Sequence, residues 1–191
     1  DYVLILNNDK VIDRHALKHL LAAAALVGSV GMLAAKVYSH NDPLRIQYAG
    51  AQEDAENARF TYRGAGQLDD GVSYEEILEM PYVYGAAFLV STKAIADVGL
   101  LDERYFLCYE EMDWCNRMRK NGYGIYFVPK AIVWHRGESP SFGGKQSPLR
   151  TYFMERNELL WAERHMSTRA WLWLVVARTR MIVPVLGIRR I

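Results

Sequence analysis

The chain has 191 residues, of which 51% are hydrophobic, 12% aromatic and 24% charged, and its formal net charge is +1. This length and apolar content suit one folded domain and exclude a disordered chain, and no fixed repeat indicates a solenoid. The balanced charge argues against a nucleic-acid binder, and two cysteines are too few for a disulfide-built secreted fold.

The chain opens inside a predicted core strand. Residues 2–6 form a continuous apolar run, which is typical of a central parallel strand covered on both faces. Asn7, Asn8 and Asp9 follow as turn-forming residues. Because few intact proteins begin inside a core strand, we expect a fragment whose N-terminal part is missing.

A helix and a second strand are predicted next. Asp13 is expected to cap a helix over residues 15–27, and residues 32–38 predict another strand. This strand–helix–strand order indicates a βαβ unit in an α/β architecture. Residues 39–80 are polar and rich in glycine, so we expect an irregular region that holds substrate or acts as a lid.

The middle of the chain begins with a predicted strand over residues 82–90. Ser91 is expected to cap the short helix that follows, because a serine oxygen can accept a bond from the first helical turn. That helix should end near Gly99.

A stronger helix is predicted over residues 110–120. The pair at 121–122, Asn-Gly, is typical of a left-handed helix end and should stop it. Residues 125–128 and 131–134 are predicted to be separate short strands, because Pro129 cannot donate a ladder hydrogen bond.

The last third of the chain changes character. A loop rich in Gly, Ser and Pro over 137–148 precedes a predicted helix over 150–165, and 170–188 is apolar with interrupting arginines. No acidic residue follows Glu163, whereas six arginines do. This basic, tryptophan-containing stretch predicts association with a membrane surface, the alternative being packing on the domain or a partner. The arginines argue against a membrane span.

Two positions are candidate metal ligands. Asp9 comes directly after a predicted strand, where α/β folds place ligands, and a carboxylate there can hold Mg²⁺ or Mn²⁺ beside a diphosphate. His135 ends another predicted strand, a position from which an imidazole can ligate a metal. The alternatives are a plain turn and a structural histidine. The remaining histidines have no such setting and are expected to be surface or helix residues: His15, His19, His40 and His165.

An acidic cluster and a later helix are further candidates. Glu110, Glu111 and Asp113 repel one another, which raises at least one pKa toward that of a general base; alternatively they simply favour the helix dipole. Arg156 can bind a phosphate and Asn157 can fix a loop by hydrogen bonds, the alternative being a solvated helix face.

Taken together, these residues and their order resemble the family 2 glycosyltransferases, and within them the rhamnosyltransferase-like branch. The strongest similarity is at residues 109–117, which resemble the family's Glu-Asp-x-Asp helix. The resemblance covers nearly the whole chain, and its stretches are Asp1–Asp9, Val83–Val90, Gly99–Phe106, Tyr109–Arg117, Val128–Ala131 with His135, and Tyr152–Asn157.

The resemblance implies a GT-A, Rossmann-like α/β fold: a mixed sheet flanked by helices, lacking its first strands. Residues 1–148 would be a partial catalytic domain, and residues 149–191 a helical extension at a membrane surface. The implied activity is transfer of a sugar, with inversion, from a nucleoside-diphosphate donor to a glycan or lipid-linked acceptor. The implied setting is cell-envelope or surface polysaccharide synthesis at the cytoplasmic side of the membrane. Nucleic acid is not expected among the partners.

The resemblance also implies residue roles. Asp9 and His135 would ligate Mg²⁺ or Mn²⁺, and Glu111 would be the base. The other implied site residues are Glu110 and Asp113 as support or acceptor ligands, Asn7 through its amide oxygen, Gly85 and Ala86 lining the sugar pocket, and Arg156.

Two positions depart from the family pattern. Asn7 stands where the first Asp of Asp-x-Asp is usual, and Glu111 stands where the base is usually Asp. Both departures favour an alternative, a non-catalytic GT-A-like module that binds glycan or organises an assembly. A metal-dependent phosphohydrolase is disfavoured, because nothing resembles a second metal cluster. The fragment itself is not expected to turn over alone.

Overall fold

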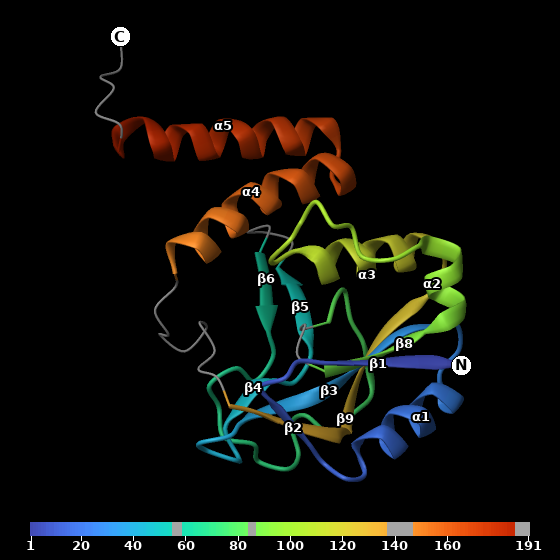
Figure 1. Ribbon diagram of the computed structural model, residues 1–191. Helices are drawn as coiled ribbons and strands as arrows, with labels where there is room; N and C mark the ends of the chain where they lie inside the picture. The colour runs from blue at the N-terminus through green and yellow to red at the C-terminus, as the bar shows by residue number, and fades with distance from the viewer. Residues whose placement is uncertain (55–58, 84–86, 137–146, 186–191) are drawn as a thin grey trace.

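The computed structural model describes residues 1–54, 59–83, 87–136 and 147–185. Within these ranges, one mixed sheet has the strand order β1-β8-β3-β9-β2, with β4 added to β3 and β7 added to β9 (Figure 1). β3 and β9 are parallel, and the other neighbours are antiparallel. The strands are β1 (Tyr2–Leu6), β2 (Lys10–Ile12), β3 (Val30–Ser39), β4 (Ile46–Tyr48), β7 (Leu78–Glu79), β8 (Ala87–Ser91) and β9 (Gly124–His135).

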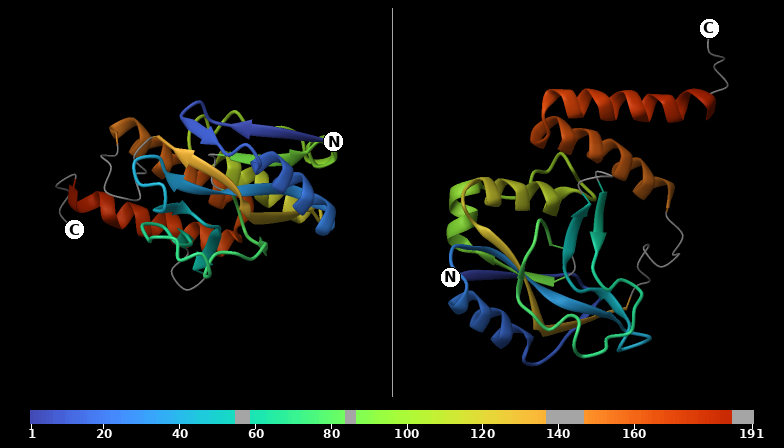
Figure 2. Two further views of the ribbon diagram at one scale, coloured as in Figure 1. Left: turned by 90° about the horizontal axis from the view of Figure 1, so that it is seen from below. Right: turned by 180° about the vertical axis from the view of Figure 1, so that it is seen from behind.

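Helices cover both faces of this sheet. The side chains of β3 alternate, so Leu33 packs with Leu20 of α1 on one face, and Met32 packs with Trp114 and Met118 of α3 on the other. Figure 2 shows α1 and α3 on opposite sides of the strands, with α4 and α5 stacked beyond α3. The helices are α1 (Ala16–Leu26), α2 (Thr92–Val98), α3 (Glu110–Lys120), α4 (Pro148–His165) and α5 (Thr168–Val185).

The first strand is not the central strand that its apolar run predicts. β1 is the end strand in the described sheet and pairs antiparallel with β8, with Val3 44% and Leu6 38% exposed. Because β8 is antiparallel to both β1 and β3, these two strands point the same way with β8 between them. An apolar run indicates burial of a strand but carries no information about its neighbours.

The region predicted to be irregular over residues 39–80 contains paired strands. β5 (Ala51–Asp54) and β6 (Arg59–Tyr62) form an antiparallel ladder of their own, in addition to β4 and β7. The buried Lys36 of β3 anchors the following loop, because its ammonium contacts Asp69 at 2.8 Å and Glu75 at 2.5 Å. The polar residues of this region therefore gave no indication of its short strands. Pairing holds these strands, and the ion pairs of the buried Lys36 hold the loop.

The two short strands expected around Pro129 are one continuous strand, β9. Opposite β3, Val128 pairs with Ala35 and Ile132 pairs with Lys36, so the residues between them bulge out of the ladder. The bulge accommodates the proline that has no N–H to donate, without ending the strand. Of the strand predicted over 82–90, Tyr82 and Val83 lie outside any strand, residues 84–86 lie outside the described ranges, and β8 begins at Ala87.

The predicted helix boundaries agree with the structure at most positions. Ser91 caps α2 by accepting a bond from the Ala94 amide, and Gly122 follows α3 with φ of +80°. Asp13 instead accepts a bond from the backbone N–H of His15, which is itself the residue before α1. The short side chain at position 13 closes the preceding turn and does not reach the helix.

The C-terminal helices pack on the domain and on each other. Arg178 of α5 forms ion pairs with Glu155 and Glu158 of α4, and so fixes α5 along α4. None of the helices in the described residues is long and apolar enough to cross a membrane. On α5, Leu172 is 50% and Trp173 69% exposed.

Candidate active site

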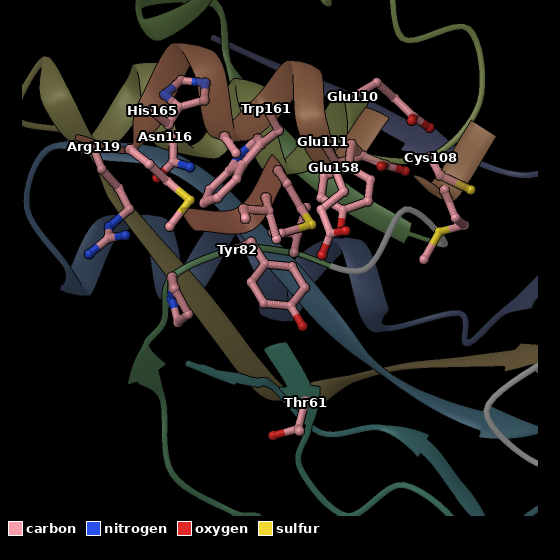
Figure 3. A pocket seen from close by; sticks show the side chains of 18 of the residues that line it. Thr61, Tyr82, Cys108, Glu110, Glu111, Asn116, Arg119, Glu158, Trp161 and His165 are labelled. Atoms are coloured by element: carbon pink, nitrogen blue, oxygen red, sulfur yellow. The ribbon is translucent and has the colours of Figure 1, made fainter. Parts of the chain in front are cut away.

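A cavity of about 1050 Å³ lies between α3, α4 and α5, and its floor includes β6 and the segment before β8. Asn7, at the carboxyl end of β1, lines it. In Figure 3, Glu110, Glu111 and Glu158 lie to the right of Trp161, whereas Asn116, Arg119 and His165 lie to its left. The cavity therefore joins the end of β1 to the acidic helix start that the sequence singles out.

Two carboxylates at the start of α3 line this cavity. The loop before them contains consecutive left-handed residues, with φ of +66° at Cys108 and +72° at Tyr109, and this turn directs the first turn of α3 into the space. Burial, and then the charge of neighbouring Glu110, raise the pKa of Glu111 well above that of an ordinary carboxyl. In the described part of the chain, Oε2 of Glu110 is buried without a hydrogen-bond partner. Glu111 is therefore a carboxylate with unusually high basicity.

Asp113 lies behind the cavity and does not line it. It is fully buried, and its two oxygens accept bonds from His165 Nε2 and Arg117 Nε, both at 2.7 Å. Burial alone would raise the pKa of Asp113, but the bonds from His165 and Arg117 lower it below its ordinary value. Asp113 was expected either to support the acidic cluster or to bind the acceptor. These contacts favour the supporting role.

His165 is a site residue that the sequence does not reveal. Its side chain is 4% exposed and joins α4 to α3 through Asp113, which lies 52 positions earlier in the chain. His165 is a helix residue, as expected, but the sequence did not indicate its contact with Asp113 or its place in the cavity lining. No local pattern could have indicated this pair, because each partner follows the periodicity of its own helix.

Asn157 holds the loop before α3, as the sequence predicts. Its buried side-chain amide donates to the carbonyl oxygens of Tyr105, Leu107 and Cys108, at 2.8, 2.7 and 2.7 Å. Arg156 donates to Asn157 Oδ1 at 2.9 Å and to the carbonyl of Arg104, and it does not line the cavity. Arg156 therefore takes part in the loop anchor, and its binding of a phosphate stays a prediction.

Replacing Asn157 with Ala is expected to lower the free energy of unfolding by about 2–3 kcal/mol, because buried loop carbonyls lose their donor. Urea unfolding followed by circular dichroism measures this change. Asn121→Ala is the matched control, since Asn121 is exposed and donates to a single carbonyl, that of Arg117. Similar losses in the two variants would contradict the anchoring role of Asn157.

The two predicted metal ligands are brought into contact. β2 pairs with the end of β9 so that Lys10 stands opposite His135, and this register places Asp9 beside the imidazole. Asp9 Oδ2 lies 3.0 Å from His135 Nε2, and Asp9 Oδ1 lies 2.9 Å from Lys10 Nζ. Burial alone would raise the pKa of Asp9, but the bonds from Lys10 and His135 keep this pKa below its ordinary value.

Gln47 orients the imidazole of His135. Burial, and then the charge of Lys10, lower the pKa of His135, which favours the neutral ring with one proton. His135 Nδ1 lies 2.6 Å from Gln47 Oε1, so a proton on Nδ1 can be donated to this oxygen. With the proton on Nδ1, the Nε2 lone pair would be left for a metal in place of the bond that Nε2–H otherwise donates to Asp9, and this is the tautomer that metal coordination requires.

The spacing of these two groups fits a divalent cation. Ligands about 2.1 Å from a metal and at right angles to each other are about 3.0 Å apart, which is the Asp9–His135 separation. Within the described ranges, no three His, Cys, Asp or Glu side chains gather around one point. The described residues therefore offer two ligands here, and other groups would have to complete the coordination.

Some of the expected site lies outside the described residues, and some cavity residues were not expected. Gly85 and Ala86, predicted to line the sugar pocket, fall outside the described ranges. Trp161, Arg119 and Lys120 line the cavity without any sequence signal. Their positions result from the packing of α4 and α5 on α3, which periodicity alone does not specify.

The chain is similar to known proteins in sequence and in structure. A family model described as "Glycosyltransferase like family 2" matches residues 1–155. A stretch of 54 residues is 39% identical to the N-acetylglucosaminyl-diphospho-decaprenol L-rhamnosyltransferase of Mycobacterium tuberculosis, in strains CDC 1551 / Oshkosh and ATCC 25618 / H37Rv. That stretch covers 28% of this chain and only 18% of the relative.

A solved structure has a similar arrangement of helices and strands. It is the "Crystal structure of GalNAc-T7 with UDP, GalNAc and Mn2+", with a TM-score of 0.54 and 15% sequence identity. The match covers 85% of this chain and 33% of that one. The likeness confirms the expected GT-A fold, a mixed sheet flanked by helices.

Proposed function

The chain belongs to glycosyltransferase family 2, and we propose that its protein transfers a sugar, with inversion, from a nucleoside-diphosphate donor to an acceptor hydroxyl. The observation that carries this proposal is the position of Glu111. It is a carboxylate with a raised pKa in a cavity that also reaches Asn7, two residues before the Asp9–His135 pair.

Glu111 is the proposed base. The acceptor hydroxyl transfers its proton to Glu111 as the oxygen attacks the anomeric carbon, and the bond to the diphosphate breaks on the opposite side. This single displacement inverts the anomeric centre and needs no covalent nucleophile. The raised pKa supports the role, because a more basic carboxylate accepts a hydroxyl proton more readily.

Asp9 and His135 are the proposed ligands for Mg²⁺ or Mn²⁺. A bound cation would offset the negative charge that builds on the leaving diphosphate. The chain's part is to hold Asp9 by the β2–β9 register and to fix the His135 tautomer through Gln47. The mixed oxygen and nitrogen ligands suit Mn²⁺ at least as well as Mg²⁺.

The relative's name supports a lipid-linked acceptor, because that protein acts on an N-acetylglucosaminyl-diphospho-decaprenol. We infer a role in cell-envelope or surface polysaccharide synthesis, with the protein on the cytoplasmic face of the membrane. The arginines and exposed apolar side chains of α5 support surface attachment. In this assignment residues 1–148 carry the catalytic machinery, and residues 149–191 serve the acceptor and the membrane surface.

A non-catalytic GT-A-like module is the second candidate. It is favoured by the ion pair between Lys10 and Asp9, which already neutralises the carboxylate that a cation would need. Such a module would bind a glycan without metal-dependent binding of a nucleotide.

The proposed function is tested by the anomeric configuration of the product. The complete protein that carries this chain is incubated with nucleotide sugars, Mn²⁺ or Mg²⁺ and a lipid-linked acceptor, and the product is examined by proton NMR. We expect a new glycosidic bond of the configuration opposite to the donor's. Retention of configuration, or no transfer from any nucleotide sugar, would contradict the proposal.

A further inference from the structure

Part of the cavity lining is apolar and comes from the C-terminal helices and the residue that caps α4. We name this the apolar wall: Trp161 of α4, Met166 at the C-cap of α4, and Trp173 and Leu174 of α5. On the basis of the transferase function above, we propose that the apolar wall binds the prenyl chain of an acceptor whose sugar is linked to a polyprenyl diphosphate.

Cationic side chains stand beside the apolar wall. Arg119 and Lys120, in the last turn of α3, line the same cavity. Lys120 Nζ lies 3.2 Å from Nδ1 of His165, the residue directly before Met166, so positive charge and apolar surface adjoin. Among the described residues of this helix, Arg117 forms the ion pair with Asp113, whereas Arg119 lines the cavity, where its guanidinium can meet a phosphate.

The order of groups along α3 matches the order of groups in such an acceptor. Glu111 and Arg119 are separated by about 12 Å along the helix axis, at 1.5 Å per residue. This interval is long enough for one sugar ring together with the start of its diphosphate, with a hydroxyl at the carboxylate and the diphosphate at the cations. Beyond the diphosphate, the chain meets Met166, Trp173 and Leu174.

The character of the wall favours a prenyl chain over a further sugar. Methionine and tryptophan side chains give apolar contacts that adapt to a flexible hydrocarbon, whereas a hydroxyl-rich glycan would lose hydrogen bonds there. Trp173 also reaches the molecular surface, since 69% of it is exposed. The wall therefore continues outward, as required for a chain too long to be enclosed.

The experiment compares acceptors that differ only in the length of the prenol. The complete protein is assayed with N-acetylglucosaminyl diphosphate carried on decaprenol or on geraniol, both in detergent. Trp173→Ser is expected to raise KM for the decaprenyl acceptor about tenfold, and so to reduce the preference for the longer chain. Leu172→Ser is the matched control, because Leu172 is a half-exposed α5 residue outside the cavity, and it should preserve the preference.

Two outcomes would overturn the assignment. Equal loss on both acceptors in Trp173→Ser would place the effect elsewhere than on the prenyl chain. Equal loss in Leu172→Ser and Trp173→Ser would indicate only attachment of α5 to micelles or membranes. Binding of decaprenyl diphosphate alone, without donor, separates this inference from the transferase function. If the protein transfers no sugar but its binding of decaprenyl diphosphate weakens in Trp173→Ser and not in Leu172→Ser, the lipid site is supported. If the protein transfers sugar but does not bind decaprenyl diphosphate in this way, the lipid site is overturned.

Discussion

Glu111→Gln is expected to reduce the rate of sugar transfer by about 10²–10⁴-fold while leaving donor binding nearly unchanged. The amide preserves the size of the side chain and its place in the first turn of α3, but it cannot accept the hydroxyl proton. Transfer is followed as release of the nucleoside diphosphate in the presence of acceptor, and donor binding by calorimetry. Loss of donor binding together with transfer would contradict the assignment of Glu111 as the base.

The pH dependence of transfer tests whether the charge of Glu110 raises the pKa of the neighbouring Glu111. Glu111 accepts a proton only when ionised, so the rate should rise with pH through its raised pKa and level off above it. Glu110→Gln removes the adjacent negative charge and leaves the burial in place. The pKa of Glu111 should then fall part of the way toward its ordinary value, and the rise in rate should move to lower pH. An unchanged profile would show that the two carboxylates do not interact.

Asp9→Ala is expected to weaken Mn²⁺-dependent binding of a nucleoside diphosphate by about a hundredfold or more, and to abolish transfer in consequence. The physical reason is the loss of one of the two proposed ligands that the described residues offer at this point, with Lys10 losing its partner Asp9. Binding is measured by calorimetry with and without Mn²⁺.

Asp13→Ala is the control for this change. Asp13 lies in the same segment, and its carboxylate bonds to the backbone of His15, so its removal should leave metal-dependent binding intact. If Asp9→Ala bound the nucleotide as tightly as Asp13→Ala, Asp9 would not be a metal ligand, and the non-catalytic alternative would gain support.

Local patterns predicted the helix ends and the acidic cluster, because caps, left-handed glycines and charge repulsion act over a few residues. The metal pair could also be proposed, since Asp9 follows a recognisable strand and His135 ends one. Their 3.0 Å contact, however, depends on the β2–β9 register, which joins residues 126 positions apart.

Features that depend on packing between distant elements could not be predicted. The apolar run of β1 gave no sign that β8 would insert beside it, because such a run reports hydrophobicity and not pairing partners. Likewise, the burial of Asp113 against His165 arises only when α4 packs on α3. The contact of Arg156 with the loop also could not be predicted, because a helix position does not show which carbonyl its guanidinium will reach.

The central claim is that two different parts of this chain hold the donor and deprotonate the acceptor. It is tested most directly by measuring metal-dependent nucleotide binding and sugar transfer side by side in the wild type, Glu111→Gln and Asp9→Ala. We expect Glu111→Gln to lose transfer and retain binding, and Asp9→Ala to lose both. The same pattern of loss in the two variants would contradict the division of roles.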